Sequence, residues 1–391
     1  MDSIMSTYAR LPVTFERGEG AYLYDTDGKQ YLDAMCGIAV TSLGHAHEGI
    51  AEAISDQAKK LIHTSNLYHI SNQTKLADKL CQLSGMSSVF FANSGAEANE
   101  AAIKLARLYG KSKGVESPNI IVMEGSFHGR TLATLSATGN RKVRAGFSPL
   151  LSGFVRIPYN DVAAVQATAA SNKNVVAILV EPVQGEGGII VPDDDYLQQL
   201  RTICDQNDWL LMVDEIQSGM SRTGEWFGHQ HANIKPDVIT LAKALGNGVP
   251  IGACLASHSA STVLKAGTHG STFGGNPLST RAGLAVIDAM ESGDIKANAK
   301  AMGEYLHRQL DEGLQGITGF NHVRSKGLML GVVLDKDCGE LVMTALEAGL
   351  LINVTAGNVV RLLPPLTLTH AQADEIANIL LPIISDFLKA S

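Results

Sequence analysis

Three charged side chains directly follow apolar runs in the middle of the chain. Glu181 follows VVAILV, Asp214 ends LLMVD, and Lys243 follows VITLA. Such runs are typical of buried parallel strands, and open parallel sheets bind ligands at the carboxyl ends of their strands. A helix cap or a surface charge would explain any one of these residues alone. One bound cofactor would explain all three together.

Lys243 has the surroundings of a nucleophilic lysine. It is flanked by Leu241, Ala242, Ala244 and Leu245. Apolar neighbours disfavour the ammonium form and free the amine, which can then form a Schiff base with an aldehyde cofactor. The alternative is a lysine whose stem packs on the domain while its ammonium reaches water.

Asp214 is expected to be buried, and a buried carboxylate needs a permanent partner. The protonated ring nitrogen of pyridoxal phosphate would be such a partner, and the pair would make the ring a stronger electron sink. A helix N-cap or a salt bridge to a nearby arginine is the alternative.

Two glycine-containing segments could hold a phosphate. NSGAEANEAAIKLARLYG (93–110) follows the apolar run SVFFA, and Ser94 and Glu97 have capping-box spacing. Gly95 would let a ligand approach the backbone, and the helix N-terminus would offer free N–H groups and a positive dipole. The second segment, THGSTFGGNP (268–277), offers the hydroxyls of Ser271 and Thr272. Each segment alone is a weak motif.

Phe127 and Arg130 lie in the segment EGSFHGRT (124–131). The ring of Phe127 could stack on a planar cofactor, and Arg130 could hold a substrate carboxylate. A core aromatic and a surface charge are the alternatives.

The elements that must position these residues alternate along the chain. Apolar runs at 175–182, 210–215 and 238–244 and helical patterns such as 193–208 predict an α/β fold with a mainly parallel sheet. The residues 21–37 contain two extended runs around Asp27-Gly28, which predicts a hairpin. From about Ser279 we expect a long helix, short strands at 327–334 and 358–365, and a final helix. We therefore predict a large domain over 51–278 and a small α+β domain over 1–50 and 279–391.

Composition excludes several classes of protein. Of the 391 residues, 45% are hydrophobic and 18% are charged, which is ordinary globular composition. The net charge of -8 disfavours nucleic acid and anionic membranes as partners. We expect reduced cysteines and no metal site, since the five cysteines are widely spaced and the GHAH and HQH histidines lack a third ligand. The absence of a signal peptide and of a long apolar segment leads us to expect a cytoplasmic protein.

The sequence resembles the class III aminotransferases of fold type I over nearly its whole length. LLMVDEIQSGMSRTGEWF followed by KPDVITLAKALGNGVPIGA is similar to the signature of that class. The chain also contains five segments that resemble other landmarks of the class and follow in the same order: NSGAEANEAAIKLAR, SFHGRTLATLSATG, VEPVQGEGG, STFGGNPL and VVRLLPPL. Within the class, SFHGRTLATLSATGN and GIAVTSLGHAHEGI most resemble the acetylornithine aminotransferases.

The resemblance implies how pyridoxal phosphate would be held. Lys243 would carry it as a Schiff base, Asp214 would pair with the ring nitrogen, Gln217 would lie beside the ring oxygen, and Phe127 would stack on the ring. Lys243 and Asp214 would be the catalytic residues.

The resemblance also implies roles at the phosphate and the substrate. Gly95 and Ala96 would bind the phosphate through backbone N–H groups. Many relatives carry threonine where Ala96 stands, so the backbone alone must serve there. Arg130 would take a substrate carboxylate. Thr272 would reach the phosphate of the neighbouring subunit's site, with Ser271 beside the substrate, which implies a homodimer with shared active sites.

The implied reaction moves the terminal amino group of N-acetylornithine to 2-oxoglutarate in arginine biosynthesis. The reacting carbon of acetylornithine bears no carboxylate, whereas that of glutamate does. A fixed arginine beside it would be left desolvated and unpaired with acetylornithine. Arg361 and Glu186 match a switch pair in relatives, in which the carboxylate covers the arginine in one half-reaction and releases it in the other. A static salt bridge is the alternative.

Other amino donors stay open. Succinylornithine, ornithine and 4-aminobutyrate aminotransferases share most of these motifs, and additional activity on succinyldiaminopimelate stays open as well. His128 fits the enzymes for acylated ornithine better than those for ornithine. A protein that binds pyridoxal phosphate without turnover is the remote alternative.

Overall fold

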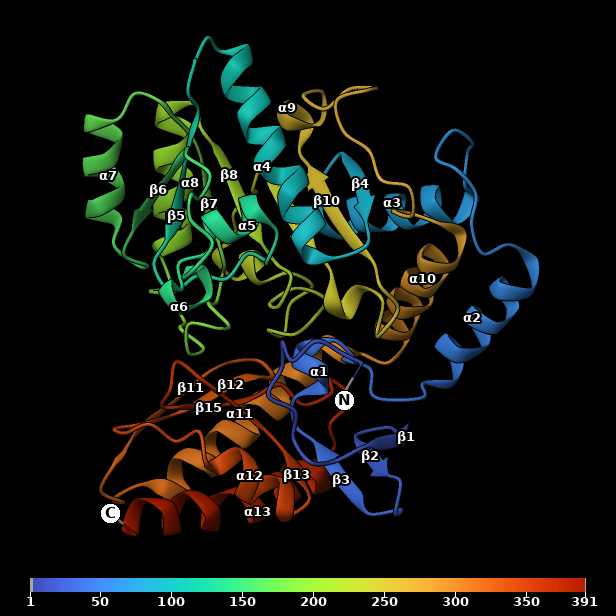
Figure 1. Cartoon of the computed structure of the whole chain (residues 1–391), viewed down its shortest axis with the longest axis vertical. Coiled ribbons are helices and arrows are strands. Elements are labelled where there is room, and N and C mark those ends of the chain that lie inside the picture. The colour runs from blue at the N-terminus through green and yellow to red at the C-terminus, as the bar shows by residue number, and fades with distance from the viewer. Residues whose placement is uncertain (1–2, 391) are drawn as a thin grey trace.

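The computed structural model of the protein describes residues 3–390 and has a large and a small lobe (Figure 1). The large lobe contains a seven-stranded sheet with the spatial order β4-β10-β9-β8-β7-β5-β6. Neighbouring strands of this sheet are parallel except at β10, which runs antiparallel to β4 and β9. The predicted α/β class with a mainly parallel sheet is therefore confirmed. The strands are β4 (Ser88–Ala92), β5 (Asn119–Met123), β6 (Phe154–Ile157), β7 (Val175–Val180), β8 (Leu210–Asp214), β9 (Val238–Leu241) and β10 (Gly252–Ala256).

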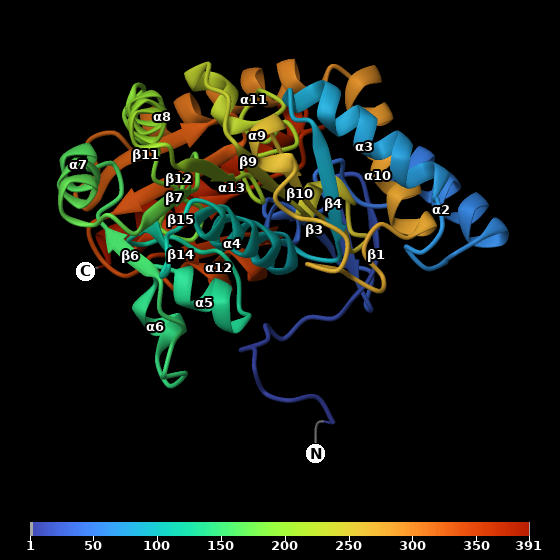
Figure 2. The ribbon, with the colours of Figure 1, turned by 90° about the horizontal axis from the view of Figure 1, so that it is seen from above.

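Helices cover both faces of this sheet because its central strands are apolar on both sides. In β7, Leu179 packs in a cluster with α4 (Gly95–Ser112), and Ile178 packs in a cluster with α8 (Tyr196–Asn207). Figure 2 shows α4 and α5 (Leu132–Ala137) on one side of the sheet and α8 with α7 (Val162–Ser171) on the other. The carboxyl ends of the parallel strands stay open between these layers.

Both chain ends build the small lobe, as the sequence predicted. Its two four-stranded sheets have the orders β1-β2-β3-β13 and β11-β12-β15-β14. The hairpin expected around Asp27-Gly28 is formed by β2 and β3, and Gly28 has a φ of 82°. The strands are β1 (Phe15–Glu19), β2 (Tyr22–Asp25), β3 (Gln30–Asp33), β11 (Phe320–Lys326), β12 (Met329–Leu334), β13 (Leu350–Leu351), β14 (Asn353–Thr355) and β15 (Val359–Leu362).

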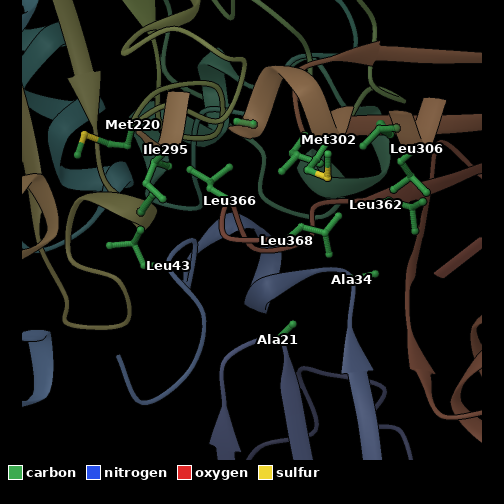
Figure 3. Close-up of a cluster of buried hydrophobic side chains, with 14 of the residues drawn as sticks. Ala21, Ala34, Leu43, Met220, Ile295, Met302, Leu306, Leu362, Leu366 and Leu368 are labelled. Atoms are coloured by element: carbon green, nitrogen blue, oxygen red, sulfur yellow. The ribbon is translucent and has the colours of Figure 1, made fainter. Parts of the chain in front are cut away.

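One apolar cluster joins the chain ends to the large lobe. Figure 3 shows Ala21 and Ala34, which flank β2 and β3, near Leu362, Leu366 and Leu368 from the C-terminal part of the chain. Leu43, three residues of helix α11 (Ile295–Leu314), namely Ile295, Met302 and Leu306, and Met220 of the large lobe belong to the same cluster. Because this core is shared, residues from both lobes can be held in one site.

The helix predicted from about Ser279 is two helices, and this part of the prediction is wrong. α10 (Pro277–Ser292) ends at Gly293, and Asp294 has a φ of 47° before α11 begins. α10 packs on α2 (Glu48–Lys60) and α3 (Ser71–Ser84), whereas α11 packs on α13 (His370–Lys389). The proposed domain boundaries at 50/51 and 278/279 fall within α2 and α10, and the division there stays a prediction. No helix within residues 3–390 combines the length and apolarity needed to cross a membrane.

A left-handed turn leads from the small lobe towards the open end of the sheet. In α1 (Cys36–Ala39), Cys36, Gly37, Ile38 and Ala39 have φ values of 50°, 59°, 68° and 60°. L-residues other than glycine rarely adopt this conformation, which costs roughly 1–2 kcal/mol each. Apolar packing holds the turn, since Ala39 lies in a buried cluster with Val183, Ile189, Met329 and Leu363.

Candidate active site

A cavity of about 430 Å³ lies at the carboxyl ends of the parallel strands. Glu181, Asp214 and Lys243, the three charged residues that follow apolar runs, all line it. Six more of the residues singled out from the sequence share this lining: Gly95, Ala96, Phe127, Arg130, Glu186 and Gln217. Segments distant in sequence thus converge on one site, as open parallel sheets allow.

Lys243 follows β9 with a φ of 45° and begins a short 3-10 turn, Lys243–Leu245. Its neighbours Ala242, Ala244 and Leu245 are buried, as their apolar character predicted. Burial lowers the pKa of Lys243 to about 8. At pH 7 about one such amine in ten is neutral, against fewer than about one in a thousand for an ordinary lysine.

Asp214 ends β8 and is buried. Its Oδ2 accepts a hydrogen bond from Asn99 Nδ2 and lies 2.8 Å from His128 Nδ1, while Oδ1 accepts from the N–H of Ile216 at 3.0 Å. Because an ionised carboxylate only accepts, Nδ1 of His128 carries the proton in this pair. No arginine within residues 3–390 pairs with Asp214. Asp214 is not a helix N-cap either, because no helix begins directly after β8.

Sequence reasoning missed Asn99 as part of the site and gave His128 no structural role. Thr240 Oγ1 donates to Asn99 Oδ1 at 2.8 Å, so the amide turns its Nδ2 towards Asp214 and towards the carbonyl of His128. All four side chains are buried. A polar residue among the alanines of ANEAAIKLA was the available signal for Asn99.

Helix α4 begins at the cavity. Ser94 is its N-cap and accepts from the N–H of Glu97 at 3.2 Å. The predicted capping box is only half formed, because the Glu97 carboxylate accepts from the N–H of Asn93 at 2.7 Å and not from that of Ser94. Within residues 3–390, the N–H groups of Gly95 and Ala96 have no acceptor. They are therefore free to bind an anion at the helix N-terminus.

Phe127, Arg130 and Glu181 form one wall of the cavity. The N–H of Phe127 donates to Glu181 Oε2 at 3.2 Å, and the guanidinium carbon of Arg130 lies 5.7 Å from the Phe127 ring centroid. Burial, and then repulsion from Asp214, raise the pKa of Glu181 well above its ordinary value. Arg130 is exposed and has no carboxylate partner among the described residues.

Arg361, on β15 of the small lobe, contacts Glu186 from behind the cavity and is not itself one of the lining residues. Its Nη1 lies 2.5 Å from Glu186 Oε1 and 3.5 Å from Gln217 Oε1, and its Nη2 donates to Asn353 at 2.8 Å. The Arg361 side chain is 1% exposed and that of Glu186 is 30% exposed. Burial alone would raise the pKa of Glu186, but attraction to Arg361 outweighs it and the pKa is lowered.

Ser271 and Thr272 lie outside the Lys243 cavity of their own chain. They line a separate depression of about 500 Å³ beside the start of α4. Ser271 Oγ accepts from the N–H of Gly274 at 2.9 Å and from Asn93 Nδ2 at 3.3 Å, and Thr272 is exposed. Their expected contact with a neighbouring subunit's site stays a prediction.

Two of the histidines in the GHAH and HQH segments pair with carboxylates. His45 Nε2 lies 2.8 Å from Asp33, and His229 Nδ1 lies 2.9 Å from Glu215. In the described part of the chain, no three or more His, Cys, Asp and Glu side chains are grouped to hold a metal ion.

Known proteins resemble this chain over its whole length. A family model described as Aminotransferase class-III matches residues 4–384. The chain is 54% identical over 390 residues to the acetylornithine aminotransferase of Nitrosomonas europaea, covering 100% of this chain and 99% of that protein. It is 55% identical over 386 residues to acetylornithine aminotransferase 1 of Bordetella bronchiseptica, covering 99% and 98%.

Solved structures show the same architecture. The ornithine aminotransferase from Toxoplasma gondii superimposes with a TM-score of 0.96 at 32% identity, covering 100% of this chain and 94% of that one. The N-acetylornithine aminotransferase from Stenotrophomonas maltophilia gives 0.86 at 36% identity, covering 99% of both. Fold and site together define a transaminase that depends on pyridoxal phosphate. The chain belongs to the class-III aminotransferase family.

The residues present fit pyridoxal phosphate. Asp214 is buried with hydrogen-bond donors, and no lysine or arginine of the described residues pairs with it, so a protonated ring nitrogen would supply the missing cation. The free N–H groups of Gly95 and Ala96 suit a phosphate. Lys243, with its lowered pKa, faces the same cavity and suits an aldehyde.

Proposed function

We propose that the protein transfers the terminal amino group of N-acetylornithine to 2-oxoglutarate, giving N-acetylglutamate semialdehyde and glutamate. The observation that carries this proposal is the Glu186–Arg361 pair, which is closed at 2.5 Å, with Glu186 lining the cavity that holds Lys243 and Arg361 buried behind it. The names of the relatives that are 54–55% identical support the choice of substrates.

Two arginines would share the work of binding carboxylates. Arg130 is exposed at the cavity and would hold the carboxylate far from the reacting carbon in both half-reactions. Arg361 would bind the carboxylate on the reacting carbon of glutamate, after Glu186 has moved away. With acetylornithine Glu186 stays in place, so Arg361 is never left as an unpaired buried charge.

The catalytic step is a proton transfer at the carbon that bears the amino group. Bound pyridoxal phosphate supplies an aldehyde that links to the substrate amine and a ring that accepts electrons from the broken C–H bond. Lys243 Nζ accepts the proton from the substrate carbon as a general base and later returns it. Asp214, held by Asn99 and His128, would pair with the protonated ring nitrogen. Phe127 would stack against the ring, and Gln217 would lie beside the ring oxygen.

We also propose a homodimer with shared active sites. Leu67, Tyr68 and Phe273 are 87%, 68% and 61% exposed, and Asn66 Nδ2 joins their two loops by donating to the carbonyl of Ser271 at 3.1 Å. Exposed apolar side chains of this size mark protein interfaces. Thr272 stands in the same patch and would reach the phosphate of the partner's site.

A cytoplasmic location is part of the same proposal. All five cysteines are free thiols, and four of them are buried. Reduced thiols are typical of proteins from a reducing compartment.

The test is the visible absorbance of the purified holoenzyme, titrated in turn with N-acetylornithine, ornithine, 4-aminobutyrate and glutamate. We expect N-acetylornithine and glutamate to change the cofactor spectrum at low concentration, and ornithine and 4-aminobutyrate only weakly.

Lys243→Ala should lose nearly all turnover. Succinylornithine and succinyldiaminopimelate belong in the same series, because acylated donors share the chemistry at the reacting amine. If ornithine converted the cofactor best, as the structural likeness to ornithine aminotransferases would allow, the substrate assignment would be wrong.

A further inference from the structure

A second cavity, of about 480 Å³, is lined by three arginines. Arg141 and Arg144 come from α6 (Arg141–Arg144), and Arg156 comes from β6. Glu124, Gly125 and Gly139 complete the lining, and none of these residues lines the Lys243 cavity. Figure 1 shows α6 below β5 and β6, at the edge of the large lobe. We call this cavity the arginine pocket.

The guanidinium groups of the arginine pocket form no ion pairs in the described part of the chain. Among residues 3–390, no carboxylate forms an ion pair with Arg141, Arg144 or Arg156. Glu124 is the acidic residue in the lining, so three positive charges face one negative charge. Burial, and then the charge of Arg144, lower the pKa of Arg156. The lining therefore has a formal excess of two positive charges, with Arg141 and Glu124 exposed to solvent, and a bound anion would neutralise this excess.

The arginine pocket also has donors without acceptors. The Nε atoms of Arg144 and Arg156 are buried and have no hydrogen-bond partner in the described part of the chain. Arg156 is nevertheless fixed in place, because its Nη2 donates to the carbonyls of Ser136 at 2.7 Å and Thr138 at 3.1 Å. Arg156 thus lines the pocket with its guanidinium held in one orientation, and a guanidinium fixed in this way can donate to an oxyanion with little further ordering.

We propose that the arginine pocket binds a phosphate dianion. A dianion matches the excess charge of about +2, and its tetrahedral oxygens can accept from more than one guanidinium edge at once. A single carboxylate would leave one positive charge uncompensated. Inorganic phosphate and the phosphate group of a small phosphomonoester share this chemistry.

Hydrogen bonds connect residues at the arginine pocket to two segments that line the catalytic cavity. Gln184 Nε2, two residues before Glu186, donates to the carbonyl of Glu124 at 2.9 Å. The N–H of His128 donates to Thr138 Oγ1 at 3.0 Å, and the carbonyl of Thr138 accepts from Arg156. The proposed anion site is thus separate from the proposed transaminase chemistry but shares its supporting loops.

The test is isothermal titration of the holoenzyme with inorganic phosphate and, separately, with glycerol phosphate, at an ionic strength held constant with chloride. In the holoenzyme the cofactor already occupies the phosphate cradle at α4. We expect one anion to bind per chain, and Arg144→Gln to weaken binding at least tenfold. Lys142→Gln is the matched control, since Lys142 is an exposed cation of the same short helix that does not line the pocket. The double variant Arg141→Gln/Arg144→Gln is measured in the same way.

The ratio of the two affinities assigns the source of the dianion: tighter binding of glycerol phosphate indicates a phosphomonoester, and tighter binding of inorganic phosphate indicates the free ion. Three results would overturn the proposal. They are no binding of either anion at millimolar concentration, an unchanged Kd in the double variant, and equal weakening by Lys142→Gln.

Discussion

At the scale of single residues, the cavity holds carboxylates in very different surroundings. Glu181 is buried, accepts one N–H from Phe127, and has its pKa raised by burial and by Asp214. Glu186 is paired with Arg361, which lowers its pKa in spite of burial. Similar side chains in one site thus favour opposite charge states, and the two environments predict different responses to amide substitution.

Glu181→Gln should stabilise the protein at neutral pH and raise its melting temperature there. In the unfolded chain Glu181 ionises at its ordinary pKa of 4.5, whereas the folded protein keeps it protonated to higher pH. The stability that Glu181 contributes is therefore complete below pH 4.5 and lost as pH rises towards the folded-state pKa. Glutamine does not titrate, so the gain should vanish near pH 4. Melting curves of both proteins from pH 4 to 8 measure this, and parallel curves would contradict it.

Glu186→Gln should change the ratio of kcat/KM for glutamate to that for N-acetylornithine by about tenfold or more, which corresponds to about 1.4 kcal/mol. An amide competes less with the carboxylate of glutamate for Arg361, and it leaves the charge of Arg361 uncompensated when acetylornithine is bound. Half-reaction rates with each amino donor measure the ratio. Glu312→Gln, at an exposed position of α11, is the control. An unchanged ratio would mean that the pair is a static salt bridge.

The sequence indicated Lys243 and Asp214 because a charged residue directly after an apolar strand is a local signal. Asn99 and His128 gave no such signal. They meet Asp214 across 115 and 86 positions of the chain, and the meeting depends on how α4 packs against β8. Arg361 and Glu186 were found through resemblance, since nothing in VVRLLPP by itself pairs an arginine with a loop 175 positions away.

At the scale of elements, the start of α4 depends on a close contact between two segments. A Cβ added at Gly95 would lie 2.7 Å from Cδ1 of Ile216, whose own N–H donates to Asp214. Glycine thus lets the helix N-terminus lie directly against the loop that follows β8. This contact therefore couples the N–H groups of Gly95 and Ala96, which would bind the phosphate, to the Asp214 carboxylate, which would pair with the ring nitrogen.

Gly95→Ala should weaken the binding of pyridoxal phosphate about tenfold while changing stability little, because alanine favours helix by about 1 kcal/mol over glycine. The added methyl would push Ile216 aside and shift the free N–H groups of Gly95 and Ala96. Titration of the apoenzyme with pyridoxal phosphate gives the Kd. Gly339→Ala is the control, because a Cβ there meets no neighbouring atom within 4 Å. A Kd within twofold of that of the parent protein would refute the coupling.

The strands were predictable as elements because runs such as VVAILV are apolar on both faces. The left-handed turn at Cys36–Ala39 was not, because Cys36, Ile38 and Ala39 individually disfavour positive φ. Contacts of Ala39 with Val183, Ile189 and Met329 impose that turn, and those partners come from distant parts of the chain. The break between α10 and α11 had a local signal in Gly293, which the helical pattern on both sides outweighed.

At the scale of the whole molecule, the exposed patch of Leu67, Tyr68 and Phe273 lies beside Ser271 and Thr272. Phe273→Glu should shift the protein towards monomers and reduce kcat by at least tenfold, since a buried unpaired carboxylate would oppose association and Thr272 would leave the partner's phosphate. Sedimentation and activity, measured on the same samples, test this. Met343→Glu, on α12 (Leu341–Glu347) and 37% exposed, is the control. A fully active monomer would exclude shared sites.

The parallel pairing of β13 with β3 also governs when the protein can become active during its synthesis. Leu32 pairs with Leu350, so the first hairpin leaves the ribosome about 300 residues before its neighbour. At 5–20 residues per second, its free edge waits about 15–60 s, long enough for the central sheet to form first. Arg361 and the C-terminal helix emerge later still. A nascent or truncated chain could therefore form the floor around Lys243 without the arginine that completes the site, and cofactor capture would precede activity.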